Sequence, residues 1–350
     1  MTDTEEILFS VKGGIGHVLL NRPKALNSLT HDMCVAFKAK IDEWAADDAI
    51  EAMVIEGAGE KGFCAGGDVR AVHDSGKAGT NYWKEFFSDE YRMNAALFHF
   101  DKPFIALVDG IVMGGGVGVS EPASHRIVTE RTMYAMPETG IGLIPDVGGS
   151  YFLPRLPGRL GLYLGLTGTR IRAADCLYAG VADAYVPSDR IEALKADLRN
   201  THIAEVDDVD RIIEKYKTDP GDAPLEAIID QVNEAFSGHS VEEIVETLET
   251  AGDDWSSKTV ATLITKSPTS LKLTFRQLHE GAGLDFNDCL RMEFRLVSRS
   301  MEGNDFYEGV RAVLIDKDNA PVWKPVRIDE VSDEVIDGYF APLGQDELKL

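Results

Sequence analysis

Residues 135–153 read AMPETGIGLIPDVGGSYFL and contain two carboxylates, Glu138 and Asp146, each directly preceded by a proline. Proline fixes φ and removes a backbone donor, so each acid stands at a defined turn of the chain. The remaining residues are mostly apolar or glycine. A carboxyl group in such surroundings has a raised pKa, and a neighbouring acid raises it further, which suits acid–base chemistry near neutral pH. Taken alone, the pattern favours two helix N-caps, and the rest of the chain shifts this interpretation towards acid–base chemistry.

Composition excludes several classes of function. The chain has 350 residues and a net charge of −24, which argues against nucleic-acid binding because that role needs a basic surface. No apolar run is long enough for a membrane span. The acidic N-terminus lacks the features of a signal peptide, so we expect a cytoplasmic protein. The four cysteines form no CxxC pair and the eight histidines are scattered. We therefore expect no disulfide framework and no metal site.

Strand-like and helix-like segments alternate in the first part of the chain. Residues 9–21 favour two strands around a Gly-Gly turn, and 30–47 form an amphipathic helix. Buried strands are expected at 52–57 and 104–110, separated by a long helix at 81–100. Such alternation indicates an α/β fold with a mostly parallel, covered sheet.

Helical patterns dominate the later part of the chain. Residues 203–258 hold 16 Asp and Glu but only 4 Lys and Arg, a composition typical of solvated helical faces. We divide the chain into a core at 1–200 and a helical C-terminal region at 201–350 that packs on it, although no linker marks the boundary.

Two glycine loops are the next candidates for chemistry, because no GxSxG, HExxH, GxGxxG or Walker lysine occurs. CAGGD (64–68) and MGGGVG (113–118) both follow an expected strand and lead into a helix. Free backbone N–H groups at a helix start can bind an oxygen that becomes negative, so two such loops would make an oxyanion hole. For either loop alone, tight packing of helix on strand is the simpler interpretation.

The combination of motifs resembles the enoyl-CoA hydratase/isomerase (crotonase) superfamily, and within it most resembles the 3-hydroxyisobutyryl-CoA hydrolases. The resemblance covers about residues 9–325. It is carried by NRPKALNSL (21–29), GFCAGGD (62–68), MGGGVG (113–118), AMPETGIGLIPDVGGSYFLPRL (135–156), SPTSLKLTFRQL (267–278), EFRL (293–296) and DFYEGVRAVLIDKD (305–318). It implies a crotonase-like spiral of ββα turns that binds an acyl-CoA thioester.

The resemblance also implies roles for individual residues. The thioester oxygen would be held by the N–H groups of Gly67 and Gly115. Hydratases of the superfamily use two glutamates; one corresponds to Glu138, but the other corresponds to Gly118, which offers no acid or base. Asp146 stands where hydratases usually have glycine. This exchange resembles the hydrolases and implies that Glu138 and Asp146 serve attack on the thioester, with Glu138 either activating water or attacking directly.

Substrate-binding residues follow from the same resemblance. Glu90, Gly114 and Asp68 would line the acyl pocket, although Glu90 can equally be a surface helix acid. Coenzyme A is anionic and the protein is acidic, so positive charge is needed at the mouth of the pocket. Arg311 and Lys317 are weaker candidates for this charge. The residues that we expect to bind coenzyme A are Arg22, Lys24, Ala25, Leu26, Lys61 and Ala65.

The resemblance implies hydrolysis of 3-hydroxyisobutyryl-CoA, a step that the family performs in valine breakdown. A hydratase or isomerase of the same fold, and a non-catalytic acyl-CoA-binding protein, are the alternatives. The expected partner is the acyl-CoA substrate, with no nucleic acid and no membrane, and the sequence leaves open whether the chain also forms a homo-oligomer. No metal or redox cofactor is expected, since coenzyme A is part of the substrate.

Overall fold

The computed structural model describes residues 5–350, and the chain divides into two compact units. The first unit comprises residues 1–67, 89–134 and 171–226. The second comprises 68–88, 135–170 and 227–350. The division expected at residue 200 stays a prediction.

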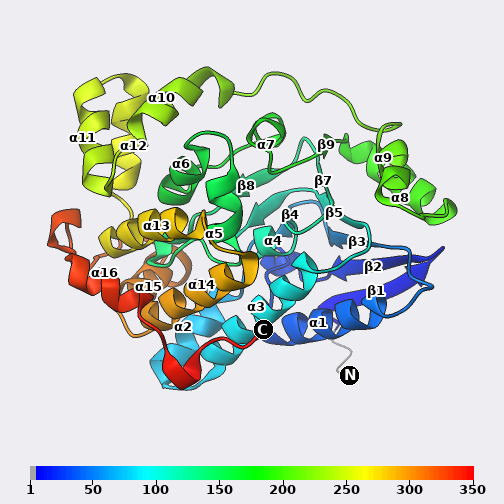
Figure 1. Ribbon diagram of the computed structural model, residues 1–350, viewed down its shortest axis with the longest axis horizontal. Helices are drawn as coiled ribbons and strands as arrows, with labels where there is room; N and C mark the ends of the chain where they lie inside the picture. Colours follow the sequence, from blue (N-terminus) through cyan, green and yellow to red (C-terminus); the bar gives the residue numbers. More distant parts are fainter. Residues whose placement is uncertain (1–4) are drawn as a thin grey trace. The chain divides into compact units, whose positions relative to one another are not determined.

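The first unit is built on a six-stranded sheet in the order β1-β2-β3-β5-β7-β9 (Figure 1). Its first two strands pair antiparallel, as the Gly-Gly turn predicts, and all later pairs are parallel. The strands are β1 (Ile7–Lys12), β2 (Ile15–Leu20), β3 (Ala52–Gly57), β5 (Phe104–Val108), β7 (His125–Val128) and β9 (Ala184–Tyr185).

A second, three-stranded sheet has the order β4-β6-β8, with β4 (Gly62–Cys64), β6 (Ile111–Met113) and β8 (Met133–Ala135). The chain visits the large sheet and then the small sheet in three successive turns: β3 then β4, β5 then β6, β7 then β8. Helices follow β4 and β6, so this is the expected spiral of ββα turns. The sequence predicts no strand at β4 or β6, because strands of three residues among glycines show no periodicity.

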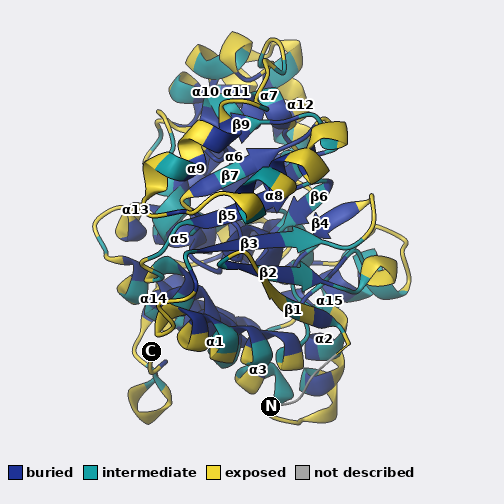
Figure 2. Cartoon of the chain, turned by 90° about the vertical axis from the view of Figure 1, so that its right-hand side faces the viewer, coloured by how far each residue is buried: buried dark blue, intermediate teal, exposed yellow. Residues whose placement is uncertain are grey.

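The first unit also contains helices, which pack against both of its sheets. They are α1 (His31–Ala45), the second half of α3 (Tyr82–Phe98), α4 (Gly115–Gly118), α7 (Ala173–Ala179), α8 (Ile191–Asn200) and α9 (Val206–Ile213). The apolar face expected for the first of these is buried, and Thr30 caps its start by accepting the amide of Met33. Figure 2 shows the central strands β3, β5 and β7 mostly in the colour of buried residues, as expected for a covered parallel sheet.

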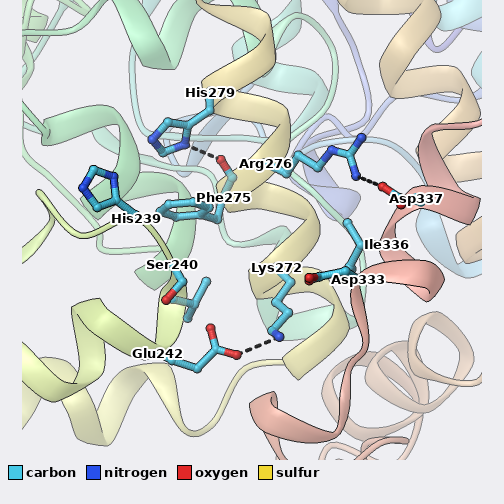
Figure 3. Close-up of a pocket in the computed structure, with 11 residues that line it drawn as sticks. His239, Ser240, Glu242, Lys272, Phe275, Arg276, His279, Asp333, Ile336 and Asp337 are labelled. Atoms are coloured by element: carbon cyan, nitrogen blue, oxygen red, sulfur yellow. Dashed lines mark hydrogen bonds and ion pairs between the residues drawn. The ribbon is translucent and has the colours of Figure 1, made fainter.

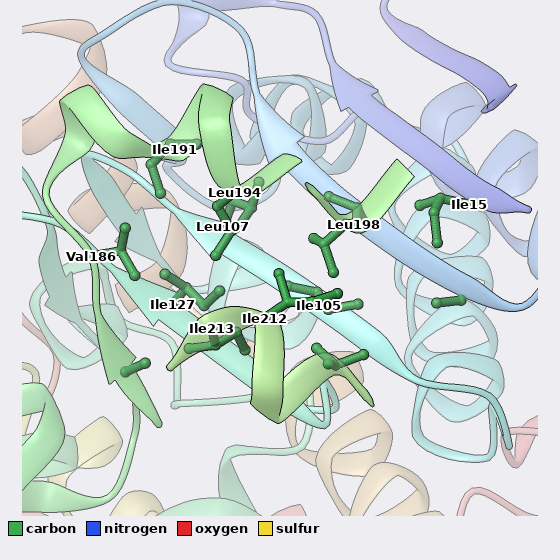
Figure 4. Packing of buried hydrophobic residues seen from close by; sticks show 14 of the residues in the cluster. Ile15, Ile105, Leu107, Ile127, Val186, Ile191, Leu194, Leu198, Ile212 and Ile213 are labelled. Atoms are coloured by element: carbon green, nitrogen blue, oxygen red, sulfur yellow. The ribbon is translucent and has the colours of Figure 1, made fainter. Parts of the chain in front are cut away.

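Helices α8 and α9 contribute the apolar side chains that close one face of this sheet (Figure 4). Ile191, Leu194 and Leu198 lie along α8 at spacings of three and four residues, so a single helix stripe meets the strands. The cluster also includes Ile15, Ala52, Val54, Ile105, Leu107, Ile127, Ala184, Val186, Ile203, Val209, Ile212 and Ile213.

The second unit is almost entirely helical, in agreement with the patterns read from the later sequence. Its helices are α2 (Val69–Ala78), α5 (Gly149–Phe152), α6 (Leu160–Thr167), α10 (Ile229–Ala235), α11 (Val241–Ala251), α12 (Asp254–Leu263), α13 (Pro268–Gly281), α14 (Phe286–Ser300), α15 (Asp305–Val310) and α16 (Asp333–Phe340). Among residues 5–350, no helix has the length and apolar character required to cross a bilayer.

Shortening one apolar side chain of α8 tests this packing. Leu194 is fully buried in the cluster, so Leu194→Ala removes apolar contacts and leaves a cavity, and we expect a loss of about 2–5 kcal/mol of unfolding free energy. The control Val35→Ala changes an exposed residue of α1 and should cost no more than about 0.5 kcal/mol. Urea denaturation measures both. Equal losses would contradict the assignment of Leu194 to the core.

Candidate active site

The two glycine loops of the first unit are in contact, because they follow adjacent parallel strands. Strand β4 pairs with β6, so both loops leave the same edge of the small sheet. A β-carbon placed on Gly115 would lie 3.1 Å from the amide nitrogen of Gly67 and 2.6 Å from Oε1 of Glu90. No side chain fits at Gly115. The structure therefore brings together Gly67, Gly115 and Glu90, three residues that the sequence placed in the site.

Glu90 lies on α3 and is 2% exposed, which excludes its interpretation as a surface acid. Gly114 is the N-cap of the short helix α4, with φ of 48°. Gly118 ends that helix and is buried; its carbonyl accepts a hydrogen bond from Nδ2 of Asn94 at 3.0 Å. The position where hydratases carry an acid thus presents only backbone in this chain.

The residues expected to bind coenzyme A fall on two neighbouring segments of the first unit. The amide of Ala65 donates to the carbonyl of Leu26 at 3.0 Å, which joins the loop after β4 to the turn around η1 (Pro23–Ala25). A pocket of about 440 Å³ beside this turn is lined by Glu5, Glu6, Asn21, Arg22, Pro23, Lys24 and Ala25.

The charges of that pocket are partly balanced. Arg22 forms an ion pair with Glu6 at 3.1 Å and donates to the carbonyl of Ser28 at 2.7 Å. Lys24 and Lys61 are exposed. In the second unit, Arg311 contacts three carboxylates, those of Glu308, Asp316 and Asp318, so its charge is already neutralised.

Asn27 is a residue that sequence analysis did not single out, although it lies within NRPKALNSL. It is fully buried in a left-handed conformation with φ of 58°. Its Nδ2 donates to the carbonyls of Ala58 and Gly62 at 2.9 and 2.8 Å, and its Oδ1 accepts the amide of Arg22. Asparagine tolerates this conformation better than most residues, which was the available signal.

The two carboxylates of the opening stretch lie in the second unit. Glu138 begins the short helix η2 (Glu138–Ile141) and is 6% exposed; Asp146 follows in the loop before α5 and is 5% exposed. Oε2 of Glu138 is buried, and it has no hydrogen-bond partner within residues 5–350. Neither acid is an N-cap: Pro137 caps η2 and Gly148 caps α5.

The pKa of Glu138 is raised well above its ordinary value of 4.5. Burial is the main cause, and the negative charge of Asp146 adds to it. The amide of Glu138 and the ammonium group of Lys266 act in the opposite direction. Lys266 lies against the same short helix, since its Nζ is 3.5 Å from the position of a β-carbon on Gly140. Its own pKa is lowered by burial and by Arg170, and Glu138 counters part of this.

Later parts of the sequence hold η2 in place. The amide of Ser267 donates to the carbonyl of Thr139 at 3.0 Å, and the Thr139 hydroxyl donates to the carbonyl of Leu166 at 3.1 Å. Helix α15 packs closely, because a β-carbon on Gly309 would lie 2.4 Å from the backbone of Ile141. The motifs SPTS and DFYEG therefore support the stretch that carries Glu138.

Asp68 has a structural role in the same unit. Its carboxylate accepts the amide of Ala71 at 3.3 Å and caps α2. No cluster of three or more His, Cys, Asp or Glu side chains that could hold a metal ion occurs between residues 5 and 350.

A larger pocket of about 470 Å³ in the second unit contains none of the predicted site residues. It lies among α11, α13 and α16, and its cations are paired: Lys272 with Glu242 at 2.7 Å and Arg276 with Asp337 at 2.5 Å (Figure 3). The remaining lining residues are His239, Ser240, Val241, Phe275, His279, Asp333 and Ile336. It offers no buried acid for chemistry.

The enoyl-CoA hydratase/isomerase family model matches residues 15–340. The chain therefore belongs to the enoyl-CoA hydratase/isomerase family. It is 47% identical to the mitochondrial 3-hydroxyisobutyryl-CoA hydrolase of Danio rerio, over 99% of this chain and 92% of the relative. It is 43% identical to that of Homo sapiens, over 99% and 91%.

Solved structures agree on the fold but carry other names. A carnitinyl-CoA dehydratase from Mycobacterium thermoresistibile is 40% identical, with a TM-score of 0.92 and 99% of both chains covered. An enoyl-CoA hydratase from Rhodobacter sphaeroides is 35% identical, with a TM-score of 0.91 over 99% of this chain and all of that one. The crotonase fold expected from the sequence is confirmed, whereas the reaction has to be argued from side chains.

The expectation of a cytoplasmic protein is wrong by the same comparisons, since the hydrolases that match nearly the whole chain are named mitochondrial. The inference rested on the acidic character of the first ten residues. That character describes these residues alone and carries no information about the compartment.

Asn27 offers a stability test of the loops in the first unit. Asn27→Ala removes the donor to the buried carbonyl of Gly62 and to the partly buried carbonyl of Ala58, and the buried loss alone costs about 1–3 kcal/mol. Asn27→Asp should be at least as damaging, because a carboxylate oxygen then faces both carbonyl oxygens. Thermal unfolding of both variants measures this effect, with Asn200→Asp, an exposed helix position, as the control. An unchanged melting temperature for Asn27→Asp would contradict the described contacts.

Proposed function

We propose that this protein hydrolyses the thioester of 3-hydroxyisobutyryl-CoA to 3-hydroxyisobutyrate and coenzyme A, a step of valine breakdown. One observation carries the proposal: Glu138 and Asp146 are both buried and electrostatically coupled, whereas Gly118 presents no acid. The relatives named as hydrolases, 43–47% identical over nearly the full chain, support it independently.

The proposed chemistry divides into two tasks. The N–H groups of Gly67 and Gly115 bind the thioester oxygen, which gains negative charge when the carbonyl carbon is attacked. Glu138 activates water or attacks the carbonyl carbon itself, and both roles need its carboxylate form. The raised pKa makes that carboxylate a stronger base than a solvated glutamate. Attack forms a C–O bond, and the C–S bond then breaks to release the thiolate of coenzyme A. If water is the nucleophile, Glu138 takes one of its protons and passes it to the thiolate. If Glu138 attacks, a mixed anhydride forms, and water then hydrolyses it to 3-hydroxyisobutyrate, regenerates the carboxylate and supplies the proton for the thiol.

Asp146 orients the water, Glu138 or the substrate hydroxyl. Glu90, buried beside Gly115, lines the acyl pocket together with Gly114 and Asp68. Arg22, Lys24, Ala25, Leu26, Lys61 and Ala65 contact coenzyme A. The reaction uses no metal and no redox cofactor, and activity that survives treatment with a chelator would support the absence of a metal. The protein self-associates, and light scattering measures its molar mass in solution.

Hydration or dehydration of a C=C bond is the second candidate, because two solved structures of the family carry such names. These reactions need an acid–base group near the β-carbon, and the superfamily places one at the position of Gly118. A glycine whose carbonyl is already bound by Asn94 offers no proton. A non-catalytic acyl-CoA-binding protein is disfavoured because it has no need for a buried Glu138 with an orphaned oxygen.

Glu138→Gln tests the role of the carboxylate. The amide keeps the shape of the side chain but is neither a base nor a nucleophile, so thiol release should fall by about 10²–10⁴-fold. Binding of the acyl-CoA, measured by calorimetry, should persist. Glu249→Gln on the exposed face of α11 is the control and should behave as wild type. Turnover by Glu138→Gln at the wild-type rate would remove this residue from the mechanism.

A second test compares two substrates. Wild-type protein should release thiol from 3-hydroxyisobutyryl-CoA and hydrate crotonyl-CoA hardly at all, as followed by thiol titration and by absorbance of the double bond. Asp146→Gly should lose hydrolysis without gaining hydration, because position 118 still supplies no acid. Hydration at a rate that rivals thioester cleavage would favour the hydratase instead.

A further inference from the structure

Glu293, in the EFRL segment on α14, is a fully buried acid that the proposed chemistry does not use. Its carboxylate accepts the backbone amides of Gly148 and Ser150 at 2.9 and 2.8 Å, one on each oxygen. Burial raises its pKa to about 8 and Asp146 adds to this, whereas the two amides oppose it. Because both carboxylate oxygens of this buried acid accept hydrogen bonds from the same loop, Glu293 holds that loop in place.

The loop in question carries Asp146 next to a strained residue. Val147 has φ of 54°, a left-handed conformation that a β-branched residue adopts only when its surroundings enforce it. On one side, Nε2 of Gln277 donates to the carbonyl of Pro145 at 2.6 Å. On the other side, Glu293 holds the two amides. Asp146 and Val147 thus stand between anchors from two long helices, α13 and α14.

We propose that Glu293 is a positioning residue for Asp146. Its two hydrogen bonds keep Val147 in the left-handed conformation, and this conformation sets the direction of the Asp146 side chain. When the anchor is lost, Val147 can relax to an ordinary φ and Asp146 turns away from its working direction. The kinetic consequence rests on the proposed function, since it requires Asp146 to act in hydrolysis. The effect of Glu293 on the conformation of the loop does not rest on the proposed function.

Glu293→Gln is the direct test. Glutamine keeps the volume of the side chain but replaces one acceptor oxygen with the –NH2 group of its carboxamide. This donor then faces a backbone N–H, so one of the two hydrogen bonds is lost. We expect kcat for thiol release to fall by about 10²-fold with KM little changed, because misplacement of a catalytic group affects the reacting complex more than binding. The control Glu121→Gln removes a buried acid that pairs with Arg126 at 2.7 Å in the first unit, and its kcat should equal that of wild type.

Amide hydrogen exchange supplies a readout that needs no activity. In wild type the amides of Gly148 and Ser150 should be strongly protected, and in Glu293→Gln they should exchange faster while the amides of α13 keep their protection. Weak protection in wild type overturns the proposal even if the variant fails to fold. Equal loss of kcat in Glu121→Gln, or a wild-type kcat in Glu293→Gln, overturns it as well. A wild type without thiol release overturns the proposed function instead, and the exchange data then decide the role of Glu293 alone.

Discussion

The carboxyl group of Glu138 is buried, and contacts from several helices of the second unit hold it there. A carboxyl group withdrawn from water holds its proton more tightly, and Asp146 strengthens the effect. Because the pKa in the folded state exceeds that in the unfolded state, the contribution of this group to stability is full below pH 4.5 and is lost as the pH rises through the raised pKa. Burial of this carboxyl group therefore lowers the stability of the fold above the raised pKa, and a strongly shifted pKa of this kind is typical of a functional site.

Contacts from distant parts of the chain hold Glu138 and Asp146 in place within the second unit. Helix η2 is held by Ser267 and by the close approach of α15 at Gly309, and the loop of Asp146 is held by Gln277 and Glu293. The late motifs of the sequence therefore have a common purpose. They are the frame of the stretch that carries the acids, which explains why the family resemblance extends far beyond the glycine loops.

The sequence predicted the long elements well, because buried parallel strands and amphipathic helices have clear periodicity. It missed β4 and β6, whose three residues carry none, although their pairing is what brings Gly67 and Gly115 together. The candidate acids were found by their apolar surroundings and by resemblance. Glu293 lies in the EFRL segment of the resemblance, but its role could not be read from the sequence, because its partners lie about 145 residues earlier and only tertiary structure joins them.

A carboxyl ¹³C titration measures the pKa of Glu138 in the folded protein. The signal is assigned by comparing wild-type protein that carries ¹³C-labelled glutamate with the Glu138→Gln variant, and it is followed as the pH is raised. The account predicts that Glu138 titrates well above pH 4.5, because burial and Asp146 both oppose its ionisation. Titration near 4.5, as for a solvated glutamate, would contradict the account.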